Sequence, residues 1–253
     1  MTTDSSNNRT ISSKSTLSSK SIINVGPFTP HIEFIGQQQT PVIIIDDFGA
    51  DLSQLIDIAI DDSQFNQDQG SYYPGQRAPL PKQYVIDVIN AVYQLIYDTY
   101  KVPHSLRLKP QQCVFSVIDK PAKRLLPLQC MPHFDTPDPH YFAILHYLNN
   151  GDHGDTGFFR HNTTQYEQIS PHNIDHYFNQ AQPVVDAQQT LMPDYVVDSN
   201  DHYTLYHQVH YRPNRLVIYP GNLLHSTLVN PVTDIDSSPK TGRLTANIFI
   251  NFK

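Results

Sequence analysis

The sequence predicts an α+β fold in which helical segments come first and short antiparallel strands follow. Apolar residues recur at helical spacing between residues 50 and 102, whereas short β-like segments separated by turns dominate beyond residue 110. Two of these turns, at 149–152 and 220–222, have the Asn/Gly and Pro/Gly composition that favours hairpins. We therefore expect the second half of the chain to close into a β-sandwich or barrel, within one domain covering residues 25–253.

The first residues differ in composition from the rest. Residues 1–24 are mostly Ser, Thr, Asn and Lys with isolated Ile and Leu, so they offer too little apolar surface to offset the entropy of ordering. We expect a flexible tail here rather than a transit peptide, because no amphipathic stripe appears. Further along, the β-branched apolar run at 41–48, closed by Gly49, predicts a buried strand.

Two helices are expected to support the sheet. One spans 52–60, and the other spans 85–96 with a stronger apolar stripe. The loop between them, at 71–81, is punctuated by Pro and Gly and carries aromatic residues and one Arg. Because such loops often line pockets, Tyr73 and Arg77 are candidates for contacts with a substrate.

Beyond residue 110, several segments have the β-branched, aromatic or alternating character of strands. They cover residues 113–118, 141–148, 157–161, 215–219, 226–229 and 243–252. A polar insertion rich in His and Tyr interrupts them at 170–213. We expect this insertion to be helical at 171–180 and again at 201–211.

Composition excludes several classes of protein. The chain has 253 residues, and 39% of them are hydrophobic, which is enough to bury a core. Its net charge of −7 and the lack of a basic block argue against a nucleic-acid partner. No apolar run approaches the roughly 20 residues that span a bilayer, so no membrane partner is expected. Two cysteines, Cys113 and Cys130, fit reduced thiols in a cytoplasmic protein.

The most informative motif is an HxD element formed by His133 and Asp135. In extended backbone, residues i and i+2 project to the same side, so these two side chains can bind one metal ion from one face. A second HxD, formed by His153 and Asp155, lies among turn residues that explain it without any ligand. We therefore assign the metal to the first element.

A third ligand has to come from elsewhere in the chain. His225 follows a strand and a turn, and two His with one carboxylate on an octahedral face leave positions open, as in non-haem Fe(II) oxygenases. A catalytic zinc site is equally compatible with the spacing, but it would need a general base and has no reason to require an Arg nearby. Here Arg243 and Thr245 alternate onto one face of a strand, where a guanidinium fork and a hydroxyl can hold a carboxylate.

Taken in order, these elements resemble the Fe(II)- and 2-oxoglutarate-dependent dioxygenases, particularly their prolyl-hydroxylase-like branch, over roughly residues 113–252. The matching elements are the HxD of His133 and Asp135, the segment 143–157 that is similar to the family's "YLN…GGET" hairpin, the strand and turn before His225, and the Arg-x-Thr of Arg243 and Thr245.

The resemblance implies a double-stranded β-helix, or jelly-roll, with supporting N-terminal helices. It also implies that His133, Asp135 and His225 are the catalytic residues that bind Fe(II), and that Arg243 and Thr245 bind the 2-oxoglutarate cosubstrate. The implied reaction converts 2-oxoglutarate to succinate and hydroxylates or otherwise oxidises an amino acid, a peptide or a small metabolite.

The sequence also departs from the family pattern. Prolyl hydroxylases commonly have Lys where Arg243 stands, and an insertion at 231–240 lengthens the gap from His225. Asp135 is a carboxylate where related halogenases have a small residue, which disfavours halogenation. Two other classes stay open: a catalytically silent β-helix domain that binds a metal or small ligand, and a zinc hydrolase on a cupin-like barrel.

The remaining candidates have simpler interpretations. We expect His146 to pack in the core and Cys130 to act as a small buried hydrophobe. We assign no ligand role to His202, His207 and His210, which would share the predicted helix at 201–211, because the spacing of three between the last two suits a solvated face equally well. An apolar edge strand or the helix at 85–96 would support a homodimer.

Overall fold

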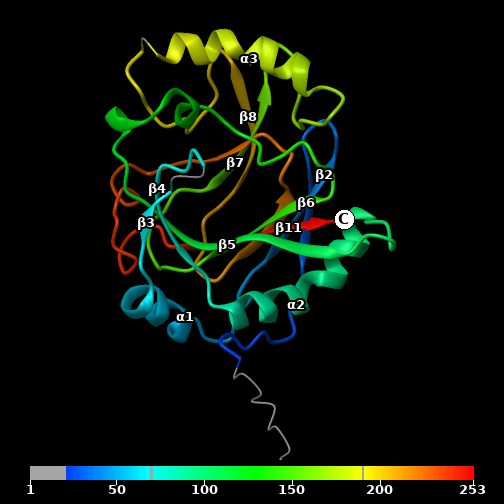
Figure 1. The fold of residues 1–253 in the computed structure, drawn as a ribbon, viewed down its shortest axis with the longest axis vertical. Coiled ribbons are helices and arrows are strands. Elements are labelled where there is room, and N and C mark those ends of the chain that lie inside the picture. Colours follow the sequence, from blue (N-terminus) through cyan, green and yellow to red (C-terminus); the bar gives the residue numbers. More distant parts are fainter. Residues whose placement is uncertain (1–20, 69–70, 190) are drawn as a thin grey trace, which may run out of the picture.

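The computed structural model describes residues 21–68, 71–189 and 191–253 (Figure 1). Of the predicted tail at 1–24, residues 1–20 lie outside the described residues. Residues 21–24 belong to the fold, because Ile23 is only 2% exposed and Ser21 Oγ donates a hydrogen bond to Asp87. The predicted boundary at residue 24 is therefore too late, because Ile22 and Ile23 pack against the core and their backbone N–H groups donate to Asp87.

Among the described residues, the paired strands are antiparallel and form two sheets. The larger sheet has the order β1-β2-β9-β6-β11-β5-β4-β3, and the smaller has the order β10-β7-β8. The strands are β1 (His31–Ile35), β2 (Thr40–Ile45), β3 (Asn66–Gln67), β4 (Gly75–Pro79), β5 (Leu108–Ile118), β6 (Tyr141–Tyr147), β7 (Thr156–His161), β8 (Tyr203–Val209), β9 (Leu216–Pro220), β10 (His225–Thr227) and β11 (Thr245–Phe252). This confirms a sheet-rich α+β class that is compatible with a β-sandwich.

The helices cover the two ends of the molecule, with α1 and α2 opposite α3 (Figure 1). They are α1 (Ser53–Asp57), which continues as a π-helical turn (Ile58–Asp62), α2 (Lys82–Tyr100) and α3 (Ile174–Gln188). The first two confirm the helices predicted at 52–60 and 85–96. None of the helices in the described part of the chain combines the length and apolar character needed to cross a bilayer.

Alternation along the strands divides the side chains between two faces of the larger sheet. In β2, Ile43 and Ile45 join the core that packs against α2, whereas Val42 and Ile44 face the smaller sheet. The space between the two sheets is therefore closed by an apolar cluster along β1, β2 and β9. The rest of that space, toward β4, β5 and β11, is available for a site.

The smaller sheet likewise has two covered faces. Phe158 packs toward the larger sheet, and the next residue, Phe159, packs toward α3 together with Tyr177 and Ala181. The order of layers is thus α2, larger sheet, smaller sheet and α3. The helix predicted at 171–180 is α3, which begins and ends later than expected.

Two predictions about segments near the site are wrong. The segment 71–81, predicted as a loop, contains β4, which pairs with β5 so closely that a Cβ on Gly75 would collide with Val117 O. The segment 201–211, predicted as a helix, contains β8, which pairs with β7. Its Tyr, Thr and Val residues have high β propensity, and pairing with β7 makes the segment a strand.

Candidate metal centre

The two predicted histidine ligands meet because their backbones pair. His133 N donates to His225 O at 2.9 Å, and His225 N donates to His133 O at 2.8 Å. In an antiparallel pair of this kind, both side chains lie on the same side of the ladder. The two imidazole centroids are accordingly 4.4 Å apart. Two backbone hydrogen bonds therefore join residues that are far apart in the sequence.

Asp135 lies two residues after His133 in the same extended segment, and its side chain points toward the two histidines. Its backbone N–H donates to Gly221 O at 2.7 Å, which keeps the segment against the connection between β9 and β10. A Cβ at position 221 would lie 2.8 Å from Asp135 Oδ2 and 2.6 Å from Tyr141 Cδ1. Glycine is therefore required where the turn passes the carboxylate.

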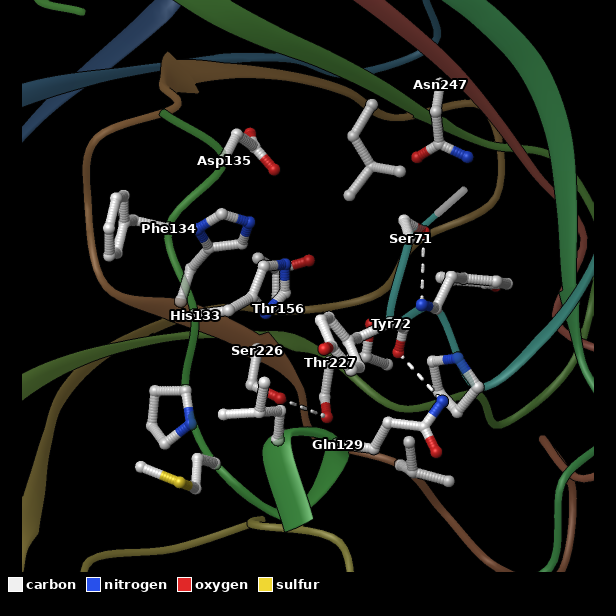
Figure 2. A pocket seen from close by; sticks show the side chains of 18 of the residues that line it. Ser71, Tyr72, Gln129, His133, Phe134, Asp135, Thr156, Ser226, Thr227 and Asn247 are labelled. Carbon is white, nitrogen blue, oxygen red and sulfur yellow. Dashed lines mark hydrogen bonds between the residues drawn. The ribbon is translucent and has the colours of Figure 1, made fainter. Parts of the chain in front are cut away.

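The three predicted ligands converge on one point. His133, Asp135 and His225 each offer one ligand atom, and these atoms lie within 4.8 Å of one another. Figure 2 shows His133 and Asp135 on one side of their segment, while Phe134 points to the other side. Within the described ranges, no other group of three or more His, Cys, Asp or Glu side chains has such spacing.

Hydrogen bonding orients His225 for a cation, and one oxygen of Asp135 is buried, whereas His133 is exposed. His225 Nδ1 lies 2.8 Å from Leu223 O, and because a carbonyl only accepts, Nδ1 carries the proton and Nε2 keeps its lone pair. Asp135 Oδ2 is buried and has no hydrogen-bond partner. A divalent cation would supply the partner that this oxygen lacks.

The pKa shifts agree with this arrangement. Desolvation by the surrounding protein, followed by His225 and Arg77, lowers the pKa of His133 well below its usual value, which favours the neutral imidazole that binds a metal. Burial raises the pKa of Asp135, whereas His225 and Arg77 act in the opposite direction.

Arg243 and Thr245 lie in the same cavity as the three ligands. Arg243 is 2% exposed, and its Nε donates to Gly154 O at 2.8 Å. Its Nη2 is buried and has no hydrogen-bond partner. Thr245 Oγ1 accepts a hydrogen bond from Asn247 Nδ2 at 3.0 Å, so its own proton remains available for a ligand. Arg243 and Thr245 can therefore both donate to a carboxylate, as predicted from their alternation.

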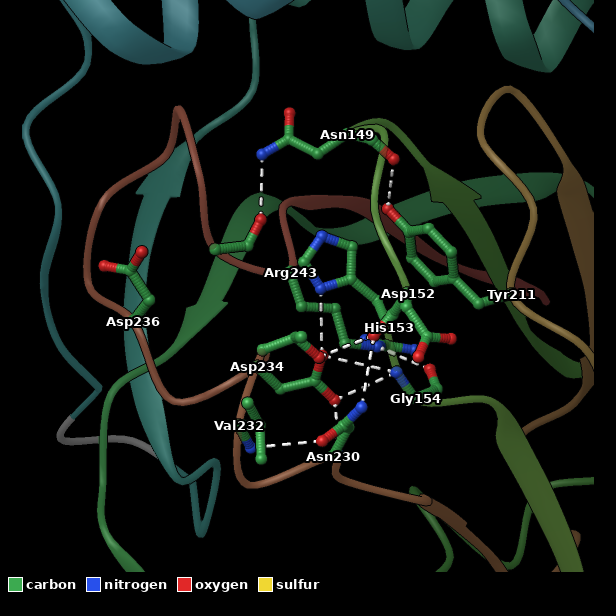
Figure 3. A network of polar contacts seen from close by, with 12 residues as sticks. Asn149, Asp152, His153, Gly154, Tyr211, Asn230, Val232, Asp234, Asp236 and Arg243 are labelled. Atoms are coloured by element: carbon green, nitrogen blue, oxygen red, sulfur yellow. Dashed lines mark hydrogen bonds and ion pairs between the residues drawn. The ribbon is translucent and has the colours of Figure 1, made fainter.

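A second network fixes the position of Arg243 (Figure 3). Asp234 is fully buried and accepts hydrogen bonds from His153 Nδ1 at 2.9 Å and from the backbone of Gly154 at 3.0 Å. Gly154 in turn accepts the Arg243 Nε hydrogen bond through its carbonyl. The insertion at 231–240, which carries Asp234, is thus part of the support of the site.

The cavity has a volume of about 470 Å³ and lies between the two sheets, where α3 adds to its wall. This volume falls within the roughly 300–1,000 Å³ that is usual for small-molecule sites. Tyr73 and Arg77, the candidates for substrate contacts, line it, with the Arg77 guanidinium carbon 4.3 Å from the centre of the Tyr73 ring. Their segment is held in the wall by Gln129 Nε2, which donates to Tyr72 O at 2.9 Å (Figure 2).

The histidines that were set aside have other partners. His146 is fully buried, with its two ring nitrogens 2.9 Å from Tyr84 Oη and 3.1 Å from Asn214 Oδ1. His202, His207 and His210 lie in or beside β8 rather than on a helix. Cys130 is buried, as expected of a small hydrophobe.

Several residues of the site were not predicted. Gly221 was identified only as part of a turn, and its contact with Asp135 depends on how that turn packs. Asp234 was placed in an insertion, and no local pattern indicates that it would be buried. The face of α3 that lines the cavity was predicted as a helix but without a role in the site.

The comparisons with known proteins give one family. Residues 27–250 match the model of DUF6445, which is described as a family of unknown function. No curated protein matches the chain. The match covers every element that contributes to the candidate metal centre.

Proposed function

The chain belongs to the DUF6445 family, and from its metal centre we propose that it is an Fe(II)- and 2-oxoglutarate-dependent oxygenase. Its reaction would hydroxylate or otherwise oxidise an amino acid, a peptide or a small metabolite. One observation carries the proposal. The ligand atoms of His133, Asp135 and His225 lie within 4.8 Å of one another beside a cavity, and one Asp135 oxygen there is buried without a partner.

The donor set fits the proposed metal. Fe(II) would be held by the imidazoles of His133 and His225 and by the carboxylate of Asp135. Two nitrogen donors and one oxygen donor on one face are the ligands of non-haem Fe(II) oxygenases, and they leave three octahedral positions for other molecules. When bound, the iron and 2-oxoglutarate would supply the oxidation of a C–H bond by dioxygen, together with formation of succinate.

Arg243 and Thr245 provide the proposed anchor for the cosubstrate. The unpartnered Nη2 of Arg243 and the hydroxyl of Thr245 would both donate to the distal carboxylate of 2-oxoglutarate. The hydrogen bond from Arg243 Nε to Gly154 O holds the guanidinium in place before the ligand arrives. The rings of Tyr147 and Tyr211, 5.4 and 5.6 Å from the guanidinium carbon, shield it from water.

We also propose that the two sheets form a double-stranded β-helix within one domain. The antiparallel pairing of both sheets supports this, as does the bridge between His133 and His225, which continues the smaller sheet beyond β10. A cavity between the sheets, with the metal ligands at the edge of the smaller one, is the arrangement that such a barrel would give.

The direct test is the formation of succinate. The full chain, loaded with Fe(II), is incubated with 2-oxoglutarate and dioxygen, alone and with a panel of amino acids, peptides and metabolites. Succinate should form, and Asp135→Ala should abolish it. Asp155→Ala, which changes the Asp of the other HxD, should retain it. Absence of succinate from the iron-loaded chain under all these conditions would refute the proposal.

The same experiment separates the two other classes. A silent binding domain would take up metal without releasing succinate. A zinc hydrolase would prefer Zn(II) and would be indifferent to both 2-oxoglutarate and dioxygen. Metal analysis after anaerobic purification distinguishes the zinc hydrolase from the oxygenase.

A further inference from the structure

The cavity contains a second guanidinium that the proposed reaction does not use. We propose that Arg77 binds the carboxylate of the substrate, and that this substrate is a small carboxylic acid with an apolar body the size of an aromatic ring. The inference rests on the proposed function in naming this acid the substrate. The binding of the acid itself is independent of iron and of 2-oxoglutarate.

Arg77 has one edge of its guanidinium occupied and another edge unused. Its Nη1 donates to Asp68 at 2.7 Å and also lies 3.3 Å from Ser71 Oγ and from Gln112 Oε1. Its Nε is buried and has no hydrogen-bond partner. A carboxylate binds a guanidinium through two parallel hydrogen bonds along one edge. The edge that contains Nε is thus the one that a ligand can use.

The guanidinium is also held in a fixed orientation. Arg77 comes from β4, whose partner strand is β5, so its backbone is part of the larger sheet. The guanidinium carbon lies 4.3 Å from the centre of the Tyr73 ring, which fixes the plane of the fork. The Arg77 side chain is only 14% exposed, so an anion has to enter the cavity to reach it.

The charge of the cavity does not oppose a second anion. Apart from histidines, the charged residues that line it in the described part of the chain are Arg77, Arg243 and Asp135. When the carboxylate of Asp68, 2.7 Å from Arg77, is counted together with the two positive charges of Fe(II) and the two negative charges of 2-oxoglutarate, the sum is zero, so no excess negative charge repels an anion. Asp68 binds Arg77 from outside this lining, so the surface that faces the cavity remains a donor of hydrogen bonds.

The apolar part of the proposed substrate follows from the apolar side chains in the cavity wall. The face of α3 contributes Tyr177, Phe178, Ala181 and Val185 to the lining. Phe178 is 52% exposed and Leu128 is 39% exposed, although both are large apolar side chains at the cavity. A ligand with an apolar body would cover them, which gains free energy in proportion to the area removed from water.

The test uses 3-phenylpropionate and 3-phenylpropionamide, which differ only in the charged group. Their binding to the full chain is measured by calorimetry, without added iron or 2-oxoglutarate. The acid should bind about tenfold or more tightly than the amide, because only the acid makes charge-assisted hydrogen bonds to the Nε edge. Equal affinities for the acid and the amide would overturn the inference without any substitution being needed.

Variants locate the binding. Arg77→Gln should weaken binding of the acid by about tenfold or more, and by more than Arg243→Gln does. The exposed control Arg124→Gln should leave it within about twofold. A loss in Arg243→Gln that exceeds the loss in Arg77→Gln would assign the acid to the cosubstrate anchor and overturn the inference. If Arg77→Gln fails to fold, Arg77→Lys replaces it, because Lys keeps the charge and loses the fork.

The apolar contact has its own variant. Phe178→Ser should weaken 3-phenylpropionate and leave acetate unchanged, and its exposed position means that the fold should tolerate the change. Equal effects on both acids would contradict the apolar part of the inference. Failure of the succinate assay with retained, Arg77-dependent acid binding would refute the oxygenase and keep the binding site. Succinate formation without Arg77-dependent binding of the acid would support the oxygenase and refute the binding site at Arg77.

Discussion

The chain contains two HxD elements, and they have opposite surroundings. Asp155 of the second element uses both carboxylate oxygens, one 2.7 Å from His210 Nδ1 and the other accepting from Tyr211 N at 2.6 Å. Its neighbour His153 contacts Asp234 instead. In the first element, Asp135 Oδ2 is buried and has no protein partner.

The difference shows what the spacing of a motif leaves undecided. Both elements place a His two residues before an Asp, but only the first lies in an extended segment that pairs with a third ligand, His225. Partners supplied by the rest of the fold turn the second element into a structural support. A shortage of such partners leaves the first element available to a cation.

The largest contrast is expected for metal binding. Asp135→Ala should remove saturable binding of Fe(II), or lower the affinity by more than about 100-fold, because a ligand and its charge are lost together. Anaerobic calorimetry with Fe(II) measures this. Asp155→Ala is the matched control and should bind as the unaltered chain does. Equal losses in both variants would erase the distinction between the two elements.

For stability, we expect the larger loss from a change beside the second HxD element and the smaller loss from a change in the first. Asp234→Ala should lower the free energy of unfolding by about 3–5 kcal/mol, because it leaves His153 Nδ1 and two backbone N–H groups buried without their acceptor. Urea denaturation measures this loss. Asp135→Ala should cost much less, since the carboxylate that it removes has an unpartnered buried oxygen. A larger loss from Asp135→Ala would contradict the comparison.

His146, a buried histidine outside both HxD elements, is expected to make the stability depend on pH. Burial lowers the pKa of His146 to about 4, although its contact with Asn214 raises it. Because the unfolded chain binds this proton near pH 6.5, the stability is complete above that pH and falls as the pH drops toward 4. The loss should approach about 3 kcal/mol. Denaturation between pH 4 and 7 should show a flatter dependence in His146→Gln, and an unchanged slope would remove His146 as the cause.

A change at Arg243 should weaken binding of the cosubstrate without changing binding of the metal. Arg243→Gln should raise the concentration of 2-oxoglutarate needed for half-maximal succinate formation by about 10- to 100-fold, since a charge-assisted fork is lost. Fe(II) affinity, measured without 2-oxoglutarate, should stay within about twofold. If the requirement for 2-oxoglutarate does not change, the anchor must be another base.

The smallest effect is expected from the turn beside Asp135. In Gly221→Ala the new Cβ would lie 2.8 Å from Asp135 Oδ2, so the carboxylate has to shift. Fe(II) affinity should fall by about tenfold, as for other changes that displace a metal ligand without removing it. Gly151→Ala, in the turn before the second HxD, is the control and should leave Fe(II) affinity unchanged.

The sequence predicted the parts of the fold that local pattern determines. The apolar periodicity of α2 and the β-branched run of β2 are confirmed, because each segment buries a face that is visible in its own residues. The segment at 201–211 was predicted as a helix because its pairing with β7 is a long-range property. β1 was not predicted, since HIEFI has only a short alternation.

The site was predicted to a similar extent. His133, Asp135 and His225 were found from their spacing and order, and the structure brings their side chains together. The carbonyl that orients His225, the glycine beside Asp135 and the buried Asp234 were not found, because each acts through a contact that the fold creates. Sequence thus predicted the candidate ligands, and the structure added what positions them.

The most direct test of the central claim is an anaerobic titration of the full chain with Fe(II) and 2-oxoglutarate, followed by visible absorption. We expect a lilac charge-transfer band that saturates as both are added, persists in Asp155→Ala and is absent in Asp135→Ala. A flat difference spectrum for the unaltered chain, or an undiminished band in Asp135→Ala, would contradict it.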